Sequence, residues 1–405
     1  MTTALRDNID WVGYVDWNVR DFHGYETLRG ATYNSYLIRD EKNTLIDTVK
    51  APYATNLLEN IAKLVDPAEI AYIVCNHAEP DHSGSLPKTV EACVNAEVVS
   101  NDKCRQTLSQ YYDTSGWKFK VVKDHETMSI GRRTLHFVNT PLIHWPESMF
   151  TYVPEEKLLF SMDAFGQHYA TSRRFDDQNP KEIALEEAKI YYANIVMLYG
   201  KRVAKLLDEG GMLDVEMIAP SHGVIWRSYV KEILEAYHNW ATYRATSKVI
   251  VLYDTMYHST ETMADAIYEG ALHPDVDVKL FNVRKTSLTT LATEFLDCAA
   301  VAVGSATLNM GMMPMIAAAL TYIKGLRPEG KAGFSFGSYG WTRGGAEGVD
   351  AFLKEMKFQI LREPIICQFR PDGSVLDKCR EAGKMISGKA LEMSAIPQAE
   401  ISSEP

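Results

Sequence analysis

The pattern of apolar and polar positions divides this chain into two parts. Up to about residue 245, short apolar runs typical of strands are mixed with stretches of helical period. The predicted strands are 44–49, 70–76, 97–100, 134–139, 149–153, 157–161 and 217–219, and the clearest predicted helices are 180–207 and 228–243. This part is therefore expected to be a mixed domain of strands and helices.

The second part alternates more regularly. Residues 248–253 form a continuous apolar run, which is typical of a buried parallel strand. Further strands are predicted at 277–283, 299–303, 331–336 and 359–367, and helices at 261–272, 289–296, 315–322, 346–357 and 375–386. Five strands alternating with five helices predict a doubly wound parallel sheet. The expected divisions are a first domain at 1–246, a second at 247–391 and a flexible tail at 392–405, which is rich in Ser, Pro and Glu.

Composition narrows the class of protein. Of the 405 residues, 46% are hydrophobic and 23% are charged, which is ordinary for a soluble globular protein. The net charge of −11 argues against non-specific nucleic-acid binding. We find neither a membrane-spanning stretch nor a signal region, and we expect a cytoplasmic protein. The six cysteines contain no C-x-x-C pair, so they are interpreted as free thiols, and no rubredoxin or iron–sulfur module is expected on this chain.

The strongest chemical signal follows the predicted strand at 70–76. There, four metal-competent residues fall within six positions: His77, Glu79, Asp81 and His82. The alternative is a polar loop with a capping Asp. His144, Asp163 and His222 each follow another apolar run, so all seven are expected to project from strand ends. Four imidazoles and three carboxylates are enough for two metals.

The absence of a thiolate from this set favours iron, manganese or zinc. Asp163 could bridge two cations, and a carboxylate-rich site tolerates two oxidation states. Zinc has no redox chemistry, so iron is preferred if the second domain delivers electrons.

Three loops of the second domain suggest a flavin. Hydroxyl side chains follow the strand at 248–253 and open a helix, where they could hold a terminal phosphate or act only as an N-cap. Two further loops follow the strands at 299–303 and 331–336, at the edge where this fold binds ligands. The absence of G-x-G-x-x-G favours a mononucleotide. The candidate FMN-binding residues are Thr255, Met256, Tyr257, Ser259, Thr260, Ser305, Thr307, Leu308, Asn309, Ser338, Tyr339, Gly340 and Trp341.

In combination, these motifs resemble the flavodiiron proteins, also called A-type flavoproteins, from about residue 11 to residue 386. The resemblance rests on H-x-E-x-D-H at 77–82, His-Trp-Pro at 144–146, Asp-Ala-Phe-Gly-Gln-His at 163–168, Pro-Ser-His-Gly at 220–223 and the three flavin loops. It implies a metallo-β-lactamase-like αββα domain followed by a flavodoxin-like domain. Zinc hydrolases of that superfamily usually have His where Glu79 stands.

The resemblance also implies a division of the ligands. His77, Glu79 and His144 match the ligands of one iron, Asp81, His82 and His222 match those of the other, and Asp163 matches the bridge. His144 is the least regular ligand in the family. His23 and Tyr191 match residues near the substrate pocket and are candidates for proton donation or hydrogen bonding; the alternative is that each is a buried structural group. His168 and Tyr192 are weaker candidates.

The implied reaction is reduction of dioxygen to water, coupling of two nitric oxides to nitrous oxide, or both. The resemblance implies FMN, a head-to-tail homodimer or dimer of dimers, and a separate electron donor such as rubredoxin or a reduced deazaflavin coenzyme. Two alternatives are a zinc hydrolase fused to a flavodoxin-like domain and an electron-transfer flavoprotein with a vestigial metal cluster.

The flavin loops depart from the family pattern at three places. Ala306 and Met310 replace a common Pro and a common Asn, and Thr342-Arg343 precedes Gly344-Gly345 where one small or polar residue is usual. We expect a positive Arg343 near the ring to raise the flavin potential, which titration of FMN in an Arg343→Ala variant tests.

Overall fold

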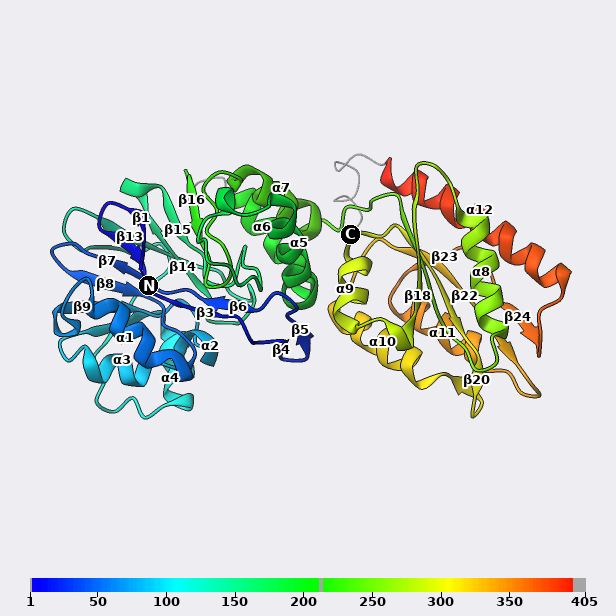
Figure 1. The fold of residues 1–405 in the computed structure, drawn as a ribbon, viewed down its shortest axis with the longest axis horizontal. Coiled ribbons are helices and arrows are strands. Elements are labelled where there is room, and N and C mark those ends of the chain that lie inside the picture. The colour runs from blue at the N-terminus through cyan, green and yellow to red at the C-terminus, as the bar shows by residue number, and fades with distance from the viewer. Residues whose placement is uncertain (1, 211–213, 396–405) are drawn as a thin grey trace. The chain divides into compact units, whose positions relative to one another are not determined.

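The computed structural model describes residues 2–210 and 214–395. Two compact units divide the chain, Met1–His238 and Asn239–Pro405, and the division falls inside helix α7 (Val230–Ala241). Each unit is described separately below, with the elements labelled in Figure 1. No described helix is both long and apolar enough to cross a membrane.

Two sheets form the centre of the first unit. The seven-stranded sheet has the order β1 (Thr3–Arg6), β2 (Ile9–Trp11), β7 (Tyr36–Ile38), β8 (Asn43–Ile46), β9 (Ile70–Val74), β10 (Glu97–Ser100), β11 (Phe119–Val121). The five-stranded sheet has the order β12 (Thr127–Ser129), β13 (Thr134–Asn139), β14 (Met149–Val153), β15 (Leu158–Phe160), β16 (Met217–Ala219). The strands predicted at 97–100, 134–139, 149–153 and 217–219 have these same bounds.

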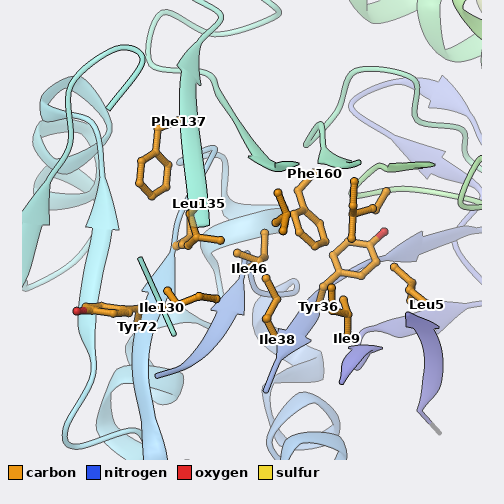
Figure 2. Packing of buried hydrophobic residues seen from close by; sticks show 14 of the residues in the cluster. Leu5, Ile9, Tyr36, Ile38, Ile46, Tyr72, Ile130, Leu135, Phe137 and Phe160 are labelled. Carbon is orange, nitrogen blue, oxygen red and sulfur yellow. The ribbon is translucent and has the colours of Figure 1, made fainter. Parts of the chain in front are cut away.

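A core of apolar side chains from both sheets joins them. Tyr36 and Ile38 of β7 belong to the same buried cluster as Leu135, Phe137 and Phe160 of the facing sheet (Figure 2). On its other face, the seven-stranded sheet buries a second cluster against helices. Alternate residues of one strand therefore supply two cores, as the pleat requires.

Helices form the outer layers of this unit, and the result is an αββα sandwich. The helices on the seven-stranded side are α1 (Ala54–Ala62), α2 (Pro80–Ser83), α3 (Leu86–Ala92) and α4 (Asp102–Tyr111). The later helices are α5 (Lys181–Tyr191), α6 (Gly200–Gly210) and α7, and they lie near β15 and β16 (Figure 1). Two small strand pairs, β3 (Tyr14–Asp16) with β6 (Ala31–Tyr33) and β4 (Asp21–Phe22) with β5 (Tyr25–Glu26), were not predicted.

The single helix predicted at 180–207 is wrong. After α5 the chain forms a short π-helical segment at Tyr192–Val196 and a 3₁₀ turn at Met197–Tyr199 before α6 begins. The side chain of Asn194 donates to the carbonyl of Ile190 at 2.8 Å, the acceptor that its own backbone N–H would use in an α-helix. The spacing of apolar residues gives no sign that the Asn194 side chain and backbone compete for this carbonyl.

The second unit contains a parallel sheet of order β18 (Asp277–Asn282), β17 (Lys248–Asp254), β19 (Ala300–Ser305), β22 (Ala332–Tyr339). The predicted strand 359–367 is wrong as one element. It is two strands, β23 (Gln359–Ile360) and β24 (Ile365–Gln368), which both pair with β22. Pro364 lies between them and has no N–H for the ladder.

Five helices pack on this sheet (Figure 1): α8 (Ser259–Ala271), α9 (Leu288–Asp297), α10 (Pro314–Leu326), α11 (Gly345–Glu355) and α12 (Gly373–Ser394). Helix α8 packs against α12, and α10 packs against α9 and α11. Helix α12 includes residues 392–394, which were predicted to belong to a tail at 392–405; residues 396–405 lie outside the described residues. The carboxyl ends of β17, β19 and β22 meet at one edge, where their three loops lie together.

Candidate metal centre and flavin site

The topology of the first unit gathers the seven candidate ligands. His77 follows β9, and α2 carries Asp81 and His82. Strands β13, β15 and β16 run in the same direction, because β13 and β15 are each antiparallel to β14 and β15 is parallel to β16. The loops that follow these three strands hold His144, Asp163 and His222, so their ligands reach the same edge of the sandwich.

One group of donors consists of His77, Glu79, His144 and Asp163. The Nε2 atoms of His77 and His144 lie 3.1 and 3.2 Å from Glu79 Oε2. Asp163 Oδ2 lies 3.3 Å from His77 Nε2 and 3.1 Å from His144 Nε2. His144, the least regular ligand of the resemblance, is thus part of the group.

The second group consists of Asp81, His82 and His222. His222 Nε2 lies 3.1 Å from Asp81 Oδ2. The other oxygen of Asp163, Oδ1, lies 3.0 Å from His82 Nε2 and 3.3 Å from His222 Nε2. The two oxygens of Asp163 therefore face different groups, which is the geometry of a bridging carboxylate.

These residues fit a pair of cations. Nitrogen and oxygen donors about 2.0–2.2 Å from one cation lie about 3 Å from each other, the spacing seen in both groups. His82 Nε2 and Asp81 Oδ1 are buried, yet neither makes a hydrogen bond of suitable geometry with any residue that the structure describes; His82 Nε2 is within 3.0 Å of Asp163 Oδ1 without one. Orphaned buried atoms are costly, and a bound cation would satisfy both.

Electrostatics couple the imidazoles to the carboxylates. Burial alone would lower the pKa of His222, but its hydrogen bonds to Asp163 and Asp81 raise that pKa to about 10. Burial would also lower the pKa of His144, but its hydrogen bonds to Asp163 and Glu79 raise that pKa to about 9. A cation has to displace protons from these nitrogens when it binds.

The groups that hydrogen-bond to the second ring nitrogens of His77 and His222 were not predicted from the sequence. Glu147 is buried, and its Oε1 accepts from His77 Nδ1 at 2.9 Å and from the backbone N–H of Ala78 at 3.1 Å. His222 Nδ1 lies 2.6 Å from the carbonyl of Thr32. One ligand is thus supported by a carboxylate and the other by a neutral carbonyl. Glu147 stands three positions after His144, but that spacing by itself does not indicate a contact with His77.

A hollow of about 360 Å³ lies over the donors. His23 and Tyr191 line it together with Glu79 and Asp163. His23 Nε2 lies 3.1 Å from Glu79 Oε1, and the Tyr191 hydroxyl donates to Asp163 Oδ1 at 2.8 Å. Both predicted pocket residues are therefore in direct contact with candidate ligands.

The two weaker candidates differ in position. The ring of His168 is buried 4.8 Å from that of Tyr191 and 5.7 Å from that of His222. Its burial lowers the pKa of His168 to about 3, so the ring is neutral. Tyr192 packs against Tyr237 instead, at 5.0 Å between ring centroids.

The three candidate flavin loops of the second unit are tied to one another. The hydroxyls of Thr260 and Ser338 lie 2.9 Å apart, and the backbone N–H of Gly345 donates to Thr307 Oγ1 at 3.0 Å. Ser305 is buried, and its hydroxyl accepts from the backbone N–H of Met313 at 2.8 Å, so this side chain holds the loop itself.

Two features of these loops fit a bound flavin mononucleotide. The hydroxyl of Thr255 is buried and has no hydrogen-bond partner among the described residues, as expected of a donor kept for a phosphate. Tyr257 and Trp341 are 88% and 91% exposed, so their rings are free to cover an isoalloxazine. The Arg343 guanidinium lies 5.2 Å from the centre of the Tyr339 ring.

The fold and the site define a class of protein: a metallo-β-lactamase-like domain with a dinuclear donor set, joined to a flavodoxin-like domain. Comparisons agree. Residues 31–223 match the model of the ODP family of β-lactamases, and residues 251–383 match the flavodoxin model.

Known relatives cover almost the whole chain. The nitric oxide reductase of Moorella thermoacetica is 42% identical over 96% of this chain and 99% of its own length. The rubredoxin oxygen:oxidoreductase of Desulfovibrio gigas has a TM-score of 0.95 at 37% identity, covering 98% of this chain and all of that one. The flavodiiron protein of Giardia intestinalis has a TM-score of 0.94 at 37% identity, covering 97% and 98%. The chain belongs to the flavodiiron family and is an oxidoreductase; the family implies FMN and a di-iron centre.

Proposed function

We propose that this protein reduces nitric oxide to nitrous oxide, dioxygen to water, or both, at two irons supplied with electrons by FMN. One observation carries the proposal: the two oxygens of Asp163 face two separate groups of nitrogen and oxygen donors. The relatives named above as nitric oxide reductase and oxygen oxidoreductase support the choice of substrates.

This geometry supports the ligand assignment that the resemblance implies. His77, Glu79 and His144 would hold one iron, Asp81, His82 and His222 would hold the other, and Asp163 would contribute to both. When bound, the irons supply the binding positions and electrons for the gas, and FMN replaces those electrons. The zinc hydrolase alternative is not favoured, because the homologues are oxidoreductases.

The reaction consumes protons, and two residues of the hollow are placed to supply or orient them. Tyr191 presents a phenol O–H between the hollow and Asp163, and His23 presents Nε2 beside Glu79. The His23 side chain is 59% exposed and so is open to solvent, whereas Tyr191 is buried. We assign proton delivery to His23 and orientation of the bridging carboxylate to Tyr191.

FMN is assigned to the three loops after β17, β19 and β22. We assign Thr255, Ser259 and Thr260 to the phosphate and Tyr257, Tyr339 and Trp341 to the ring. The remaining wall of the site is assigned to Met256, Thr307, Leu308, Asn309, Ser338 and Gly340, with Ser305 supporting it. Arg343 near the ring would favour the anionic reduced flavin.

A separate donor, rubredoxin or a reduced deazaflavin coenzyme, is proposed for the reduction of FMN, together with a cytoplasmic location. A head-to-tail homodimer, alone or paired into a dimer of dimers, is proposed to bring the flavin of one subunit to the metals of its partner.

The test is anaerobic reconstitution with each donor, with loss of dioxygen and of nitric oxide recorded side by side. We expect two irons and one FMN per chain and rapid loss of at least one gas. An Asp163→Ala variant is expected to keep FMN but lose iron and activity. Two zincs per chain, or a reduced protein that consumes neither gas, would overturn the proposal.

A further inference from the structure

Two cysteines lie in contact directly behind the metal centre. Cys75 follows β9, and Cys104 is in the first turn of α4, which begins just after β10. Because β9 and β10 are parallel neighbours, their carboxyl ends bring the two residues together. The Sγ atoms are 3.8 Å apart, and both side chains are buried, with exposed fractions of 3% and 0%.

Both cysteines are connected to the ligand His77, Cys75 through its thiol and Cys104 through its backbone N–H. The Cys75 thiol donates to the carbonyl of His77 at 3.2 Å. Asn101 caps α4 by accepting from the backbone N–H of Cys104 at 2.9 Å, and it also donates to the carbonyl of Glu147 at 2.7 Å. Glu147 in turn holds His77 Nδ1. His77 is therefore held from two sides by segments that carry these cysteines.

We propose that Cys75 and Cys104 form a site of reversible oxidation, a latent disulfide whose closure loosens His77. Sulfur atoms in van der Waals contact need to approach by about 1.8 Å to reach the bonding distance of about 2.05 Å. Closure removes the S–H donor to the His77 carbonyl and pulls on the first turn of α4, so the iron beside His77 is held less tightly.

The oxidant is a hydroperoxide, and the electrons balance. Two thiols and one hydrogen peroxide give one disulfide and two waters. Both S–H bonds and the O–O bond break, and one S–S bond and two O–H bonds form, so the thiol protons leave in the two waters. Sulfur loses two electrons while peroxide oxygen gains two. The source of peroxide rests on the proposed function, since dioxygen that receives only two electrons leaves as hydrogen peroxide. A dithiol reductant reverses the step.

The geometry selects this pair. All six cysteines are free and buried. Cys93, in the same unit, is also fully buried, but no other cysteine sulfur lies in hydrogen-bonding range of it among the described contacts. It provides a matched control for general oxidation of buried thiols.

The experiment treats the holoenzyme with hydrogen peroxide, or with diamide, a thiol oxidant that acts without iron. Denaturing alkylation and peptide mass spectrometry follow, and iron retention is measured against a chelator. In wild type and in Cys93→Ala we expect a linked 75–104 peptide, lighter by two hydrogens, and iron release at least about fivefold faster than in the reduced protein. Cys104→Ala and Cys104→Ser are expected to show neither effect, and a dithiol to restore iron retention in wild type.

Two outcomes would overturn the inference: oxidation of both cysteines to sulfinic acids without the link, or equally faster iron release in the Cys104 variants. Because the oxidant is added directly, the test of the disulfide does not depend on whether the protein reduces a gas. If added peroxide forms the link but turnover under dioxygen does not, the latent disulfide stands and peroxide release at the metals is rejected.

Discussion

At the scale of single residues, the chemistry of the site depends on groups that touch the ligands. Asp163 serves both donor groups with one carboxylate, and His77 owes its orientation to a buried Glu147. An imidazole that donates its second N–H to a carboxylate is a stronger and better oriented ligand.

Removing Glu147 is expected to weaken the metal at His77. In Glu147→Ala, iron affinity should fall by about 10- to 100-fold, because the ring loses its acceptor and the loop loses the bond to Ala78. Glu147→Gln, which keeps an acceptor oxygen, should lose less. Metal content after timed exposure to a chelator measures this. Glu186→Ala, an exposed carboxylate on α5, is the control, and equal release rates in all four proteins would contradict the expectation.

Glu187 links stability to pH. Its carboxylate lies 2.8 Å from Arg29 Nε, but Arg29 is 43% exposed and its attraction is screened by water. Burial therefore dominates and raises the pKa of Glu187 to about 7, with the charge of Glu186 adding to the rise and Arg29 opposing it. The folded state keeps the proton more tightly than the unfolded state does, so this contribution to stability is complete below about pH 4.5 and is lost as pH rises through about 7.

The unfolding free energies of wild type and Glu187→Gln are expected to differ by an amount that changes with pH. Between pH 5 and 8, wild type should lose up to about 3 kcal/mol of unfolding free energy relative to the variant. Urea unfolding of both holoproteins at the two pH values measures it, and the metal contribution cancels in the difference. A difference that does not vary with pH would mean that Arg29 keeps Glu187 ionised.

At the scale of elements, a glycine is needed where the backbone of a neighbouring strand lies too close for a Cβ atom. A Cβ at Gly337 of β22 would lie 2.0 Å from the carbonyl oxygen of Ser305 of the neighbouring β19. The flavin loops begin just after these two positions, so a displacement there moves the loops as well.

Gly337→Ala is expected to destabilise the second unit by about 1–3 kcal/mol and to weaken FMN binding. Gly325→Ala is the matched control, since a Cβ there meets nothing within 4 Å and the position is inside α10. That variant should gain about 0.5–1 kcal/mol, because alanine loses less conformational entropy in a helix. Thermal unfolding and FMN titration of both variants provide the measurement, and equal stability of the two would refute the clash.

At the scale of the whole molecule, the proposed head-to-tail dimer can be tested by complementation. Asp163→Ala removes the metals, and Thr255→Asp places a negative charge where the phosphate is proposed to bind. Each homodimer should be inactive. A heterodimer made by co-expression with two tags has one intact flavin facing one intact metal centre, so about half of wild-type activity should return. An inactive heterodimer with correct FMN and iron content would place electron transfer within one subunit.

Much of the fold follows from local pattern. The second unit is the clearest case, because strand and helix periods differ and alternate regularly. Its last predicted strand was wrong as one element, because Pro364 divides it into β23 and β24. The first unit is less predictable. Its short pairs at β3–β6 and β4–β5 contain too few residues to show a period. The π-helical segment after Tyr191 depends on the Asn194 side chain, which competes for the carbonyl of Ile190.

The sequence by itself determined the kinds of donor, since four imidazoles and three carboxylates at the ends of apolar runs indicate metal chemistry wherever they meet. It also determined the parallel sheet and the three loops at its edge. Only the tertiary structure decided that Asp163 turns one oxygen to each donor group, that Glu147 lies behind His77, and that Cys75 meets Cys104. The physical reason is range: hydrophobic period and ligand chemistry are local properties of the chain, whereas these contacts depend on how strands distant in sequence pair and on where their ends coincide.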